Sequence, residues 1–561
     1  RVKNINLRGG SLPMEITLLA PGKIVFSANN GNVGHEPWVS DGTANGTNLL
    51  KNINLPGTRD ARVAYITEMN GLLYFRADDG VNSAQLWVSN GTAAGTRMLK
   101  KIGGHSPFGS FLSYITRLGN KLIFAANDGT NGTELWESDG TPPGTKMLKG
   151  IRTGALGSDP ALMFRFGNRI LFQADDGTNG RELWITDGTP NGTRMVKNIR
   201  PGLPGSNPNS FAAVAGKVVF QADDGIAGRE LWETDGTKAG TRLLKDIRPG
   251  TSGSAPSPMS EYKGKVCFAA YSGATPASRE LWETDGTRAG TRMLKKFAGN
   301  PFSGSPQYFA EMGGLLYFDA DDGTTGIELW VTDGTAQGTK PAVDIRTGPS
   351  GSGPRFITAV GSRRLYFAAS DTAGSELWKS DGTKSGTRRL GDMNTTSFFP
   401  NNISDGRSRF AVLNDHLYFT GNDGLRGIEL WKMKNGATAH PIHEDCKTHV
   451  VSMRATDPVL GGTLKISGST GVTRPIVVLP LGFRASLASP LGSGCLSYLD
   501  LGLGIQVLMA TGLQSWTYSV PVPSDTSLSG ATVAIQAWTF PPTFLFNQLE
   551  LSNAVTLTLG N

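Results

Sequence analysis

Cysteine and histidine are scarce in this sequence, whose 561 residues include three cysteines and six histidines. They show no Cys-x-x-Cys or His-x-x-x-His spacing, so the common zinc motifs are missing. The Walker loop, the dinucleotide fingerprint and the Gly-x-Ser-x-Gly elbow are missing as well. The sequence thus offers no catalytic motif, and we predict that the chain is not an enzyme and requires no cofactor.

Long hydrophobic runs are also lacking, and no stretch approaches the roughly 18 consecutive apolar residues of a membrane helix. The sequence contains no signal peptide with a basic start and an apolar centre. We therefore expect no membrane insertion, and we expect that any export signal has already been removed.

The net charge of +7 and the isoelectric point near 9.2 raise the question of a polyanionic partner. Most lysines and arginines recur at one position after each turn, as in residues 96–101 and 241–245, and do not form one dense patch. Charges of this kind on an exposed edge strand discourage edge-to-edge aggregation. We favour that role and predict no nucleic-acid partner.

Glycine and proline, by contrast, are abundant, with 74 and 31 residues, and such a composition indicates many turns. Tryptophan forms a regular ladder with intervals of 48 to 53 residues. The ladder consists of Trp38, Trp87, Trp136, Trp184, Trp232, Trp282, Trp330, Trp378 and Trp431. We interpret these tryptophans as structural residues that pack between neighbouring repeats.

Each repeat contains four short strand-like runs separated by turn signals, most clearly within residues 211–247. There, residues 215–217 predict a tight hairpin, residues 223–225 a loop with positive φ, and residues 235–241 a longer hairpin. Four-stranded repeats of this length are typical of propeller blades, which bury their faces only against neighbouring blades. We predict an all-β fold in which a nine-bladed β-propeller is followed by a second domain.

The two ends of the repeat region indicate how the ring closes. Residues 2–7 resemble residues 50–55, which end the first repeat, whereas the ninth repeat stops early after Trp431. We therefore expect the N-terminal strand to complete the ninth blade, which removes two exposed strand edges. The alternative is that residues 438–442 supply this strand.

The repeat signature is most specific in residues 182–189, 230–237, 280–287 and 328–335, which all read Glu-Leu-Trp-x-x-Asp-Gly-Thr. It loosens at residues 85–90, at Pro37 and in the ninth copy. Over residues 1 to about 437 the chain resembles the bacterial repeat family named for this motif. The resemblance implies a secreted or cell-surface protein and no catalytic activity.

From about residue 443 the ladder ends, and alternating runs such as residues 463–467, 475–479, 504–508 and 532–538 predict a β-sandwich. We predict a propeller over 1–437, a linker over 438–446 and a sandwich over 447–561. Short phrases at 494–500 and 551–560 resemble C-terminal modules of secreted planctomycete-type proteins. Cys446 and Cys495 are expected to form a disulfide in an oxidising compartment, with two buried thiols as the alternative.

Recurring acidic loops are the candidate metal sites. They include Asp175, Asp176, Asp223, Asp224, Asp321 and Asp322. Oxygen-rich loops with glycine suit calcium, the one cofactor that the pattern allows. We expect instead that these carboxylates cap turns and pair with arginines, because the Asp-x-Asp-x-Asp spacing with a distal Glu is absent.

Aromatic residues and a broken loop are the candidate contacts for a ligand or partner. These are Tyr271, in the loop that departs from the repeat, together with Phe302, Tyr308, Phe398 and Phe399. We predict an extracellular structural or interaction scaffold, for instance a subunit of a surface layer or appendage, whose partners are other surface proteins or further copies of itself. The alternative is a glycan-binding propeller, and a secreted polysaccharide hydrolase or lyase ranks last.

Overall fold

We analysed a computed structural model of the chain. It describes residues 1–390 except 20–21, 56–58, 104–109, 274–277, 298–303 and 373, then residues 411–434 except 414–415 and 423–426; beyond residue 434 it describes only strands. The chain divides into two compact units, Arg1–Ala439 and His440–Asn561.

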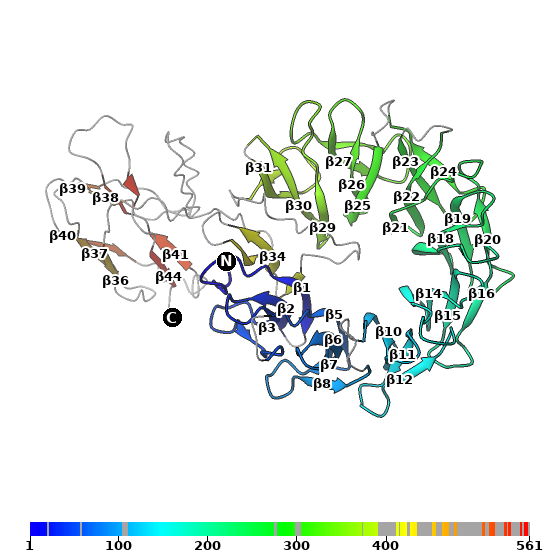
Figure 1. The fold of residues 1–561 in the computed structure, drawn as a ribbon. Coiled ribbons are helices and arrows are strands. Elements are labelled where there is room, and N and C mark those ends of the chain that lie inside the picture. The colour runs from blue at the N-terminus through cyan, green and yellow to red at the C-terminus, as the bar shows by residue number, and fades with distance from the viewer. Residues whose placement is uncertain are drawn as a thin grey trace. The chain divides into compact units, whose positions relative to one another are not determined.

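The first unit is built from antiparallel sheets that follow one another along the chain (Figure 1). Its strands are β1 (Met14–Leu19), β2 (Lys23–Asn29), β3 (His35–Ser40), β4 (Asn48–Leu49), β5 (Ala64–Met69), β6 (Leu72–Asp78), β7 (Ala84–Ser89), β8 (Arg97–Lys100), β9 (Ser113–Leu118), β10 (Lys121–Asn127), β11 (Thr133–Ser138), β12 (Lys146–Lys149), β13 (Ala161–Phe166), β14 (Arg169–Asp175), β15 (Arg181–Thr186), β16 (Arg194–Lys197), β17 (Asn209–Val214), β18 (Lys217–Asp223), β19 (Arg229–Thr234), β20 (Arg242–Lys245), β21 (Met259–Tyr262), β22 (Lys265–Tyr271), β23 (Arg279–Thr284), β24 (Arg292–Lys295), β25 (Gly304–Met312), β26 (Leu315–Asp321), β27 (Ile327–Thr332), β28 (Lys340–Val343), β29 (Arg355–Val360), β30 (Arg364–Asp371), β31 (Gly374–Ser380), β32 (Arg388–Arg389), β33 (Ala411–Leu413), β34 (His416–Asn422) and β35 (Ile428–Lys434).

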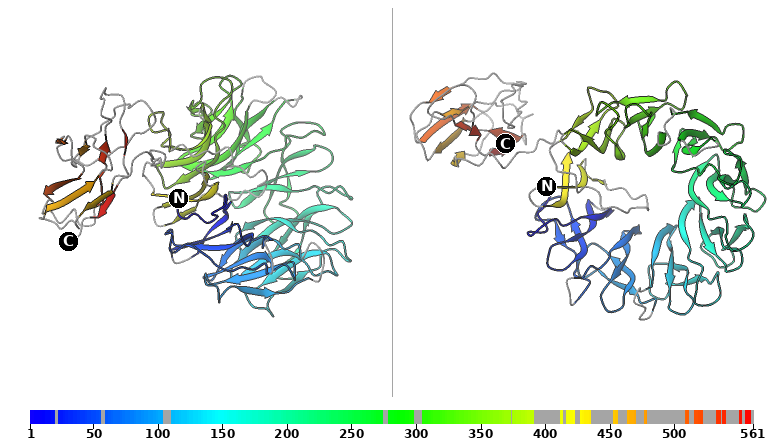
Figure 2. Two further views of the ribbon diagram at one scale, coloured as in Figure 1. Left: turned by 60° about the vertical axis from the view of Figure 1, so that its left-hand side comes forward. Right: turned by 45° about the horizontal axis from the view of Figure 1, so that its top comes forward.

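Four strands in sequence order form each sheet from β1–β4 to β17–β20, and again in β29–β32. Strands β21 to β28 form one larger sheet, in which the two halves meet through a single parallel pairing of Arg279 with Gly304. Strands β33 to β35 form a three-stranded sheet. The sheets are arranged around a ring, which is the architecture of a β-propeller (Figure 2).

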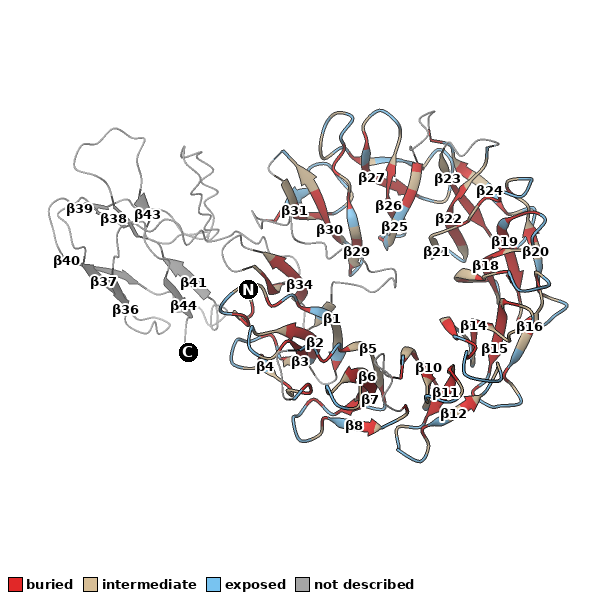
Figure 3. Ribbon diagram, in the orientation of Figure 1, coloured by how far each residue is buried: buried red, intermediate tan, exposed pale blue. Residues whose placement is uncertain are grey.

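The β17–β20 sheet shows how the repeat produces this structure. Ala215 and Gly216 adopt positive φ in the hairpin between β17 and β18. Phe220 on β18 lies opposite Trp232 on β19, and both pack against Leu183 and Ile185 of the preceding sheet. The core therefore lies between sheets, and the middle strands are the most buried (Figure 3).

The N-terminal residues lie along β35. The Val2 amide donates to the Leu430 carbonyl at 2.9 Å, and the Leu12 amide donates to the Ile428 carbonyl at 3.0 Å. Val2 and Ile5 are buried in the same hydrophobic cluster as Leu430. The alternative closing segment, residues 438–442, lies outside the described residues.

The recurring lysines at the end of each sheet have a role other than edge protection. Lys51 donates from Nζ to the Thr96 carbonyl of the next sheet at 2.7 Å, and Lys197 donates to the Thr241 carbonyl at 2.7 Å. The Lys197 ammonium also lies 5.9 Å from the centre of the Trp232 ring. These lysines therefore fasten one sheet to the next, because a buried carbonyl needs a donor.

The second unit contains β36 (Ser452–Ala455), β37 (Thr463–Ser469), β38 (Ile476–Val478), β39 (Leu508–Ala510), β40 (Ser515–Pro521), β41 (Thr532–Ile535), β42 (Ala537–Thr539), β43 (Glu550–Leu551) and β44 (Val555–Thr558). They form a β36-β37-β40 sheet, a β39-β38-β42-β43 sheet and a β41-β44 pair. Among the residues described, none belongs to a helix long and apolar enough to cross a membrane.

Candidate ligand pocket between the β1–β4 and β5–β8 sheets

The glutamate of the repeat motif is a buried structural acceptor. Glu182 accepts hydrogen bonds from the Ile199 and Arg200 amides, each at 2.9 Å, and from the Ser206 hydroxyl at 2.6 Å. Burial raises the pKa of Glu182, and the hydrogen bonds oppose that rise. The same arrangement recurs at Glu134, Glu230, Glu328 and Glu429, with Ser158, Ser254, Ser352 and Ser11 as the hydroxyl donors. Each glutamate thus ties the segment between two sheets to the middle of a sheet.

An arginine beside this glutamate fills the space between neighbouring sheets at two junctions. Arg200 donates from Nη1 to Asp223 Oδ2 at 2.6 Å, and Arg152 donates to Asp175 Oδ2 at 3.2 Å. The other oxygen of Asp223 caps the following turn by accepting from the Gly225 amide at 2.7 Å. At these two junctions the arginine and the aspartate are therefore paired with each other.

The junction between the β1–β4 and β5–β8 sheets keeps this backbone but changes three side chains. The Ala61 amide donates to the His35 carbonyl at 2.8 Å, and the Asp78 amide donates to the Ala61 carbonyl at 2.7 Å. Ser158 makes the same two backbone contacts, with Thr133 and Asp175, both at 2.9 Å. Ala61 thus replaces the serine, Asp60 replaces the preceding glycine, and Asn54 replaces the arginine.

The loss of the serine hydroxyl alters the buried glutamate at this junction. Glu36 accepts from the Ile53 amide at 2.7 Å and from the Asn54 amide at 3.2 Å, but Ala61 has no hydroxyl to donate. Burial, opposed by these two hydrogen bonds and assisted by the nearby charge of Asp60, raises the pKa of Glu36 from 4.5 to about 7. Asp60 in turn accepts from the His35 amide at 2.7 Å.

His35 begins β3 and contacts this junction through its amide, which donates to Asp60. Burial lowers the pKa of its imidazole, and the charge of Asp60 acts in the opposite direction. Its Nδ1 atom has no hydrogen-bond partner in the part of the chain that the structure describes.

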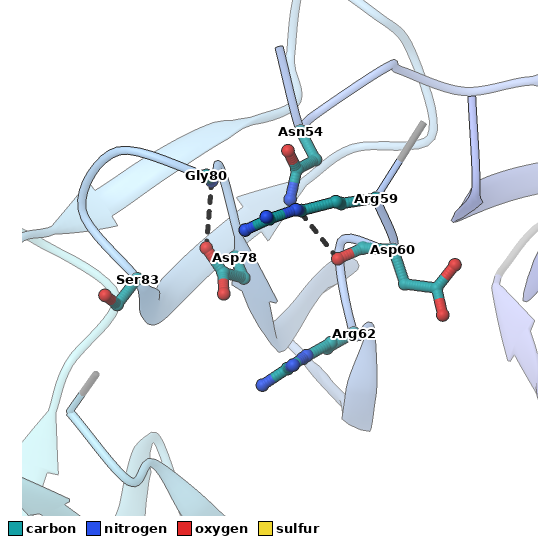
Figure 4. Close-up of a pocket in the computed structure, with 7 residues that line it drawn as sticks. All are labelled: Asn54, Arg59, Asp60, Arg62, Asp78, Gly80 and Ser83. Carbon is teal, nitrogen blue, oxygen red and sulfur yellow. Dashed lines mark hydrogen bonds between the residues drawn. The ribbon is translucent and has the colours of Figure 1, made fainter. Parts of the chain in front are cut away.

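A pocket of about 530 Å³ lies at this junction, where Asn54 stands in place of the arginine (Figure 4). Its walls are Asn54, Arg59, Asp60, Arg62, Asp78, Gly80 and Ser83. Asn54 donates to the Asp60 carbonyl at 3.3 Å and is too short to fill the space that an arginine occupies elsewhere. Arg59 and Arg62 enter the pocket from one side, and Asp78 faces them from the other (Figure 4). Within the described residues, no ion pair of Arg59, Arg62 or Asp78 is found.

This arrangement is suited to binding a small polar molecule. Two guanidinium groups present planar sets of donors, which match a carboxylate or phosphate. The carboxylates of Asp60 and Asp78 balance their charge. Glu36 and His35, whose pKa values are shifted by burial, are not among the residues that line the pocket.

The acidic loop residues predicted as calcium ligands lie in turn caps. Asp176 accepts from the Thr178 and Asn179 amides at 2.9 and 2.8 Å, and Asp224 and Asp322 cap the corresponding turns. Asp175, Asp223 and Asp321 accept from the glycine amides of the same loops. Among the described residues, no group of three or more acidic, cysteine or histidine side chains could hold a metal ion. The capping agrees with the role expected from the sequence, and calcium binding stays an untested alternative.

Of the predicted aromatic contacts, the structure describes Tyr271 and Tyr308. Tyr271 lies beside Arg248 and Arg279, with the ring centre 6.0 and 5.5 Å from their guanidinium carbons. Tyr308 lies against Phe356, with ring centres 5.3 Å apart. Phe302, Phe398, Phe399 and the Cys446–Cys495 disulfide lie outside the described residues. Cys267 is a buried free cysteine.

Sequence reasoning missed the pocket, although its signal was present. The glycine-serine pair before the first strand of a sheet occurs at 157–158, 205–206, 253–254 and 351–352. At 60–61 the sequence reads Asp-Ala, and Asn54 stands where Arg152 and Arg200 stand in later copies. Comparing the segments between repeats position by position would have singled out this junction.

Comparison with family models and with curated proteins found no match. Comparison with solved structures matched peptidases and a β-propeller domain. One structure, of prolyl endopeptidases, is 13% identical, with 73% of this chain and 54% of that chain covered and a TM-score of 0.36. A puromycin-hydrolyzing peptidase of Mycobacterium tuberculosis is 11% identical, with 73% and 59% covered and a TM-score of 0.35. The β-propeller domain of the Trilobed protease of Pyrococcus furiosus is 11% identical, with 59% and 99% covered and a TM-score of 0.30.

The ring of antiparallel sheets described above defines the class as β-propeller proteins. The chain spans little more than half the length of the first two structures, so their activities as whole proteins are not transferred to it. The prediction of a structural scaffold, with glycan binding or polysaccharide cleavage as its alternatives, is corrected by this comparison, because the similar structures are described as peptidases. At this level of identity and TM-score the likeness concerns the fold alone, and it does not establish that the chain is an enzyme.

Proposed function

We propose that the protein binds a small zwitterion, with an amino and a carboxylate group, in the pocket between the β1–β4 and β5–β8 sheets. The observation that carries the proposal is the space left by Asn54 and walled by Arg59, Arg62 and Asp78. A volume of about 530 Å³ lies within the roughly 300–1,000 Å³ range of small-molecule sites.

The charges of the pocket support this ligand class. The guanidinium groups of Arg59 and Arg62 attract a carboxylate, while Asp78 accepts a hydrogen bond from an ammonium group. The regular junctions support the second contact, because there a cationic guanidinium pairs with the aspartate equivalent to Asp78. A dianion should not bind, because its second negative charge would lie beside the carboxylate of Asp60 or Asp78 and be repelled.

Calorimetric titration of the whole chain with glycine, L-arginine and succinate tests the proposal. We expect the amino acids to bind and succinate not to bind. Asn54→Arg should abolish binding, because the new side chain fills the pocket and pairs with Asp78 as Arg200 pairs with Asp223. Arg62→Asn should weaken binding about tenfold; it is compatible with the backbone because Asn207 occupies the equivalent position with φ of 47°, close to the 50° of Arg62.

Asn207→Ala at a regular junction serves as the matched control and should leave binding unchanged. Failure of both amino acids to bind the wild-type chain, or undiminished binding by Asn54→Arg, would refute the proposal.

We also propose that the ring has nine blades, that the second unit is a β-sandwich, and that the chain belongs to the Glu-Leu-Trp-x-x-Asp-Gly-Thr repeat family and acts outside the cell. The support for the blade count is the ladder of nine tryptophans together with the three-stranded β33–β35 sheet, against which the N-terminal residues lie. Cell fractionation with an antibody against the chain tests the location, and recovery from the cytoplasm alone would contradict it.

A further inference from the structure

A charge reversal distinguishes the β29–β32 sheet, seen beside β25–β27 in Figure 1. In the β17–β20 and β21–β24 sheets the residue after the ladder tryptophan is a buried glutamate. Glu233 accepts from Lys217 Nζ at 2.7 Å and from Arg242 Nε at 2.6 Å. Glu283 is held in the same way by Lys265 and Arg292, each at 2.8 Å.

The β29–β32 sheet keeps the two cations but replaces the glutamate by Lys379. Lys379 pairs in register with Arg388, as Glu233 pairs with Arg242. Arg364 begins β30, at the position that Lys217 takes on β18. Three cationic side chains thus share a place where the β17–β20 and β21–β24 sheets, and also the β9–β12 sheet with Glu137, have two cations and one carboxylate.

The cluster has no carboxylate in contact with it among the described residues. The neighbouring Arg389 is paired with Asp371 at 3.8 Å, and Asp381 acts on Arg364 only as a nearby charge. In the next sheet the aspartate of the motif is also missing. Residues 432–436 read Lys-Met-Lys-Asn-Gly, so Lys434 stands where the motif has that carboxylate. Lys379 is 5% exposed, and an uncompensated charge at that depth is costly.

We infer that Lys379, Arg364 and Arg388 form a binding site for an oxyanion, a phosphate ion or the phosphate group of a small molecule. The anion supplies the negative charge that Glu233 and Glu283 supply in their sheets. Its tetrahedral oxygens offer acceptors in several directions, which suits one ammonium and two guanidinium groups. Burial, followed by the charges of Arg388 and Arg364, lowers the pKa of Lys379 to about 8, in agreement with crowded cations.

Titration with inorganic phosphate and with phenyl phosphate, followed by calorimetry and by the melting temperature, tests the inference. We expect phosphate to bind and to raise the melting temperature of the wild-type chain. Binding of phenyl phosphate as well would show that the site accepts a monoester, whereas binding of phosphate alone would restrict it to the free ion. Arg388→Gln, a change at an exposed position, should weaken phosphate binding about tenfold or more.

Arg389→Gln, at the adjacent exposed arginine that already has a carboxylate partner, is the control and should bind phosphate like the wild type. Lys379→Glu recreates the arrangement of Glu233, so it should raise the melting temperature without phosphate and abolish the phosphate response. The inference is wrong if the wild-type chain does not bind phosphate, or if Lys379→Glu and Arg388→Gln bind it as tightly as the wild type.

Discussion

The junction before the β17–β20 sheet and the junction before the β5–β8 sheet share one backbone design and differ in their side chains. At the first, Glu182 is saturated by backbone amides and Ser206, and Arg200 is paired with Asp223. At the second, Glu36 has lost its hydroxyl donor and Asn54 leaves a pocket. Recurrence therefore marks residues that hold the ring together, and departure from it marks the places where a ligand can be accommodated.

The largest expected effect concerns the junction at which the ring closes, which uses the same design with residues from both ends. Deleting residues 1–8 removes the hydrogen bond from Val2 to Leu430 and those from Ile5 and Asn6 to Glu429. It also removes Val2 and Ile5, whose burial is worth roughly 1.5–3 kcal/mol each. We expect a strongly lowered melting temperature, or association through the freed edge in sedimentation experiments.

Leu7→Ala, at a side chain that is 83% exposed, is the control for the deletion and should be neutral. An unchanged melting temperature and oligomeric state of the deletion variant would instead assign closure to residues 438–442.

Loss of the glutamate should lower the stability of the chain more at the regular junction of Glu182 than at the junction of Glu36, which has fewer donors to leave unpaired. Glu182→Ala leaves the Ile199 and Arg200 amides and the Ser206 hydroxyl without their acceptor, at an expected cost of about 3 kcal/mol or more in the free energy of unfolding. Glu182→Gln should cost less, because Gln85 performs the same task by accepting from the Ile102 amide at 2.7 Å. Equal destabilisation of both variants in urea unfolding would show that charge, and not the acceptor, is what matters.

Burial raises the glutamate pKa at both kinds of junction, and at Glu36 the rise is large enough to predict a pH dependence of stability. Since the pKa of Glu36 is raised from 4.5 to about 7 on folding, the folded state holds the proton more tightly. Its contribution is fully present below pH 4.5 and is lost as the pH rises to about 7 and beyond. Relative to Glu36→Gln, the free energy of unfolding of the wild-type chain should fall by up to about 3 kcal/mol as the pH rises from 4.5 to 8. Parallel stability curves for the two proteins would contradict this assignment.

The smallest expected effect comes from restoring the regular side chain. Ala61→Ser should place a hydroxyl against Glu36 and stabilise the chain by about 1 kcal/mol, while also lowering the pKa of Glu36. Ser158→Ala, the reverse change at a regular junction, should destabilise by a similar amount, because it removes the 2.6 Å hydrogen bond to Glu134. Thermal unfolding of the pair checks whether the two sites are equivalent.

The sequence was sufficient to predict the repeated sheets, because alternating apolar residues and Asp-Gly-Thr turns leave few other choices. It also predicted that residues 2–7 lie against the last sheet, and Val2 and Ile5 do so, although the structure assigns no strand to them. The role of the motif glutamate was not predictable, since its partners are backbone amides 17 and 18 residues away and a serine 24 residues away. The pocket and the Lys379 cluster emerge only when equivalent positions of different sheets are superimposed.

The hydrogen bond between Val2 and Leu430 has a mechanical consequence. The chain passes from β35 into the second unit within a few residues, so a pull on residues 440–561 reaches β35 before any other strand of the ring. The force is then borne by the contacts of β35 with the N-terminal residues and with β34. The contacts that join the two ends of the ring are therefore the first to carry a load applied to the second unit.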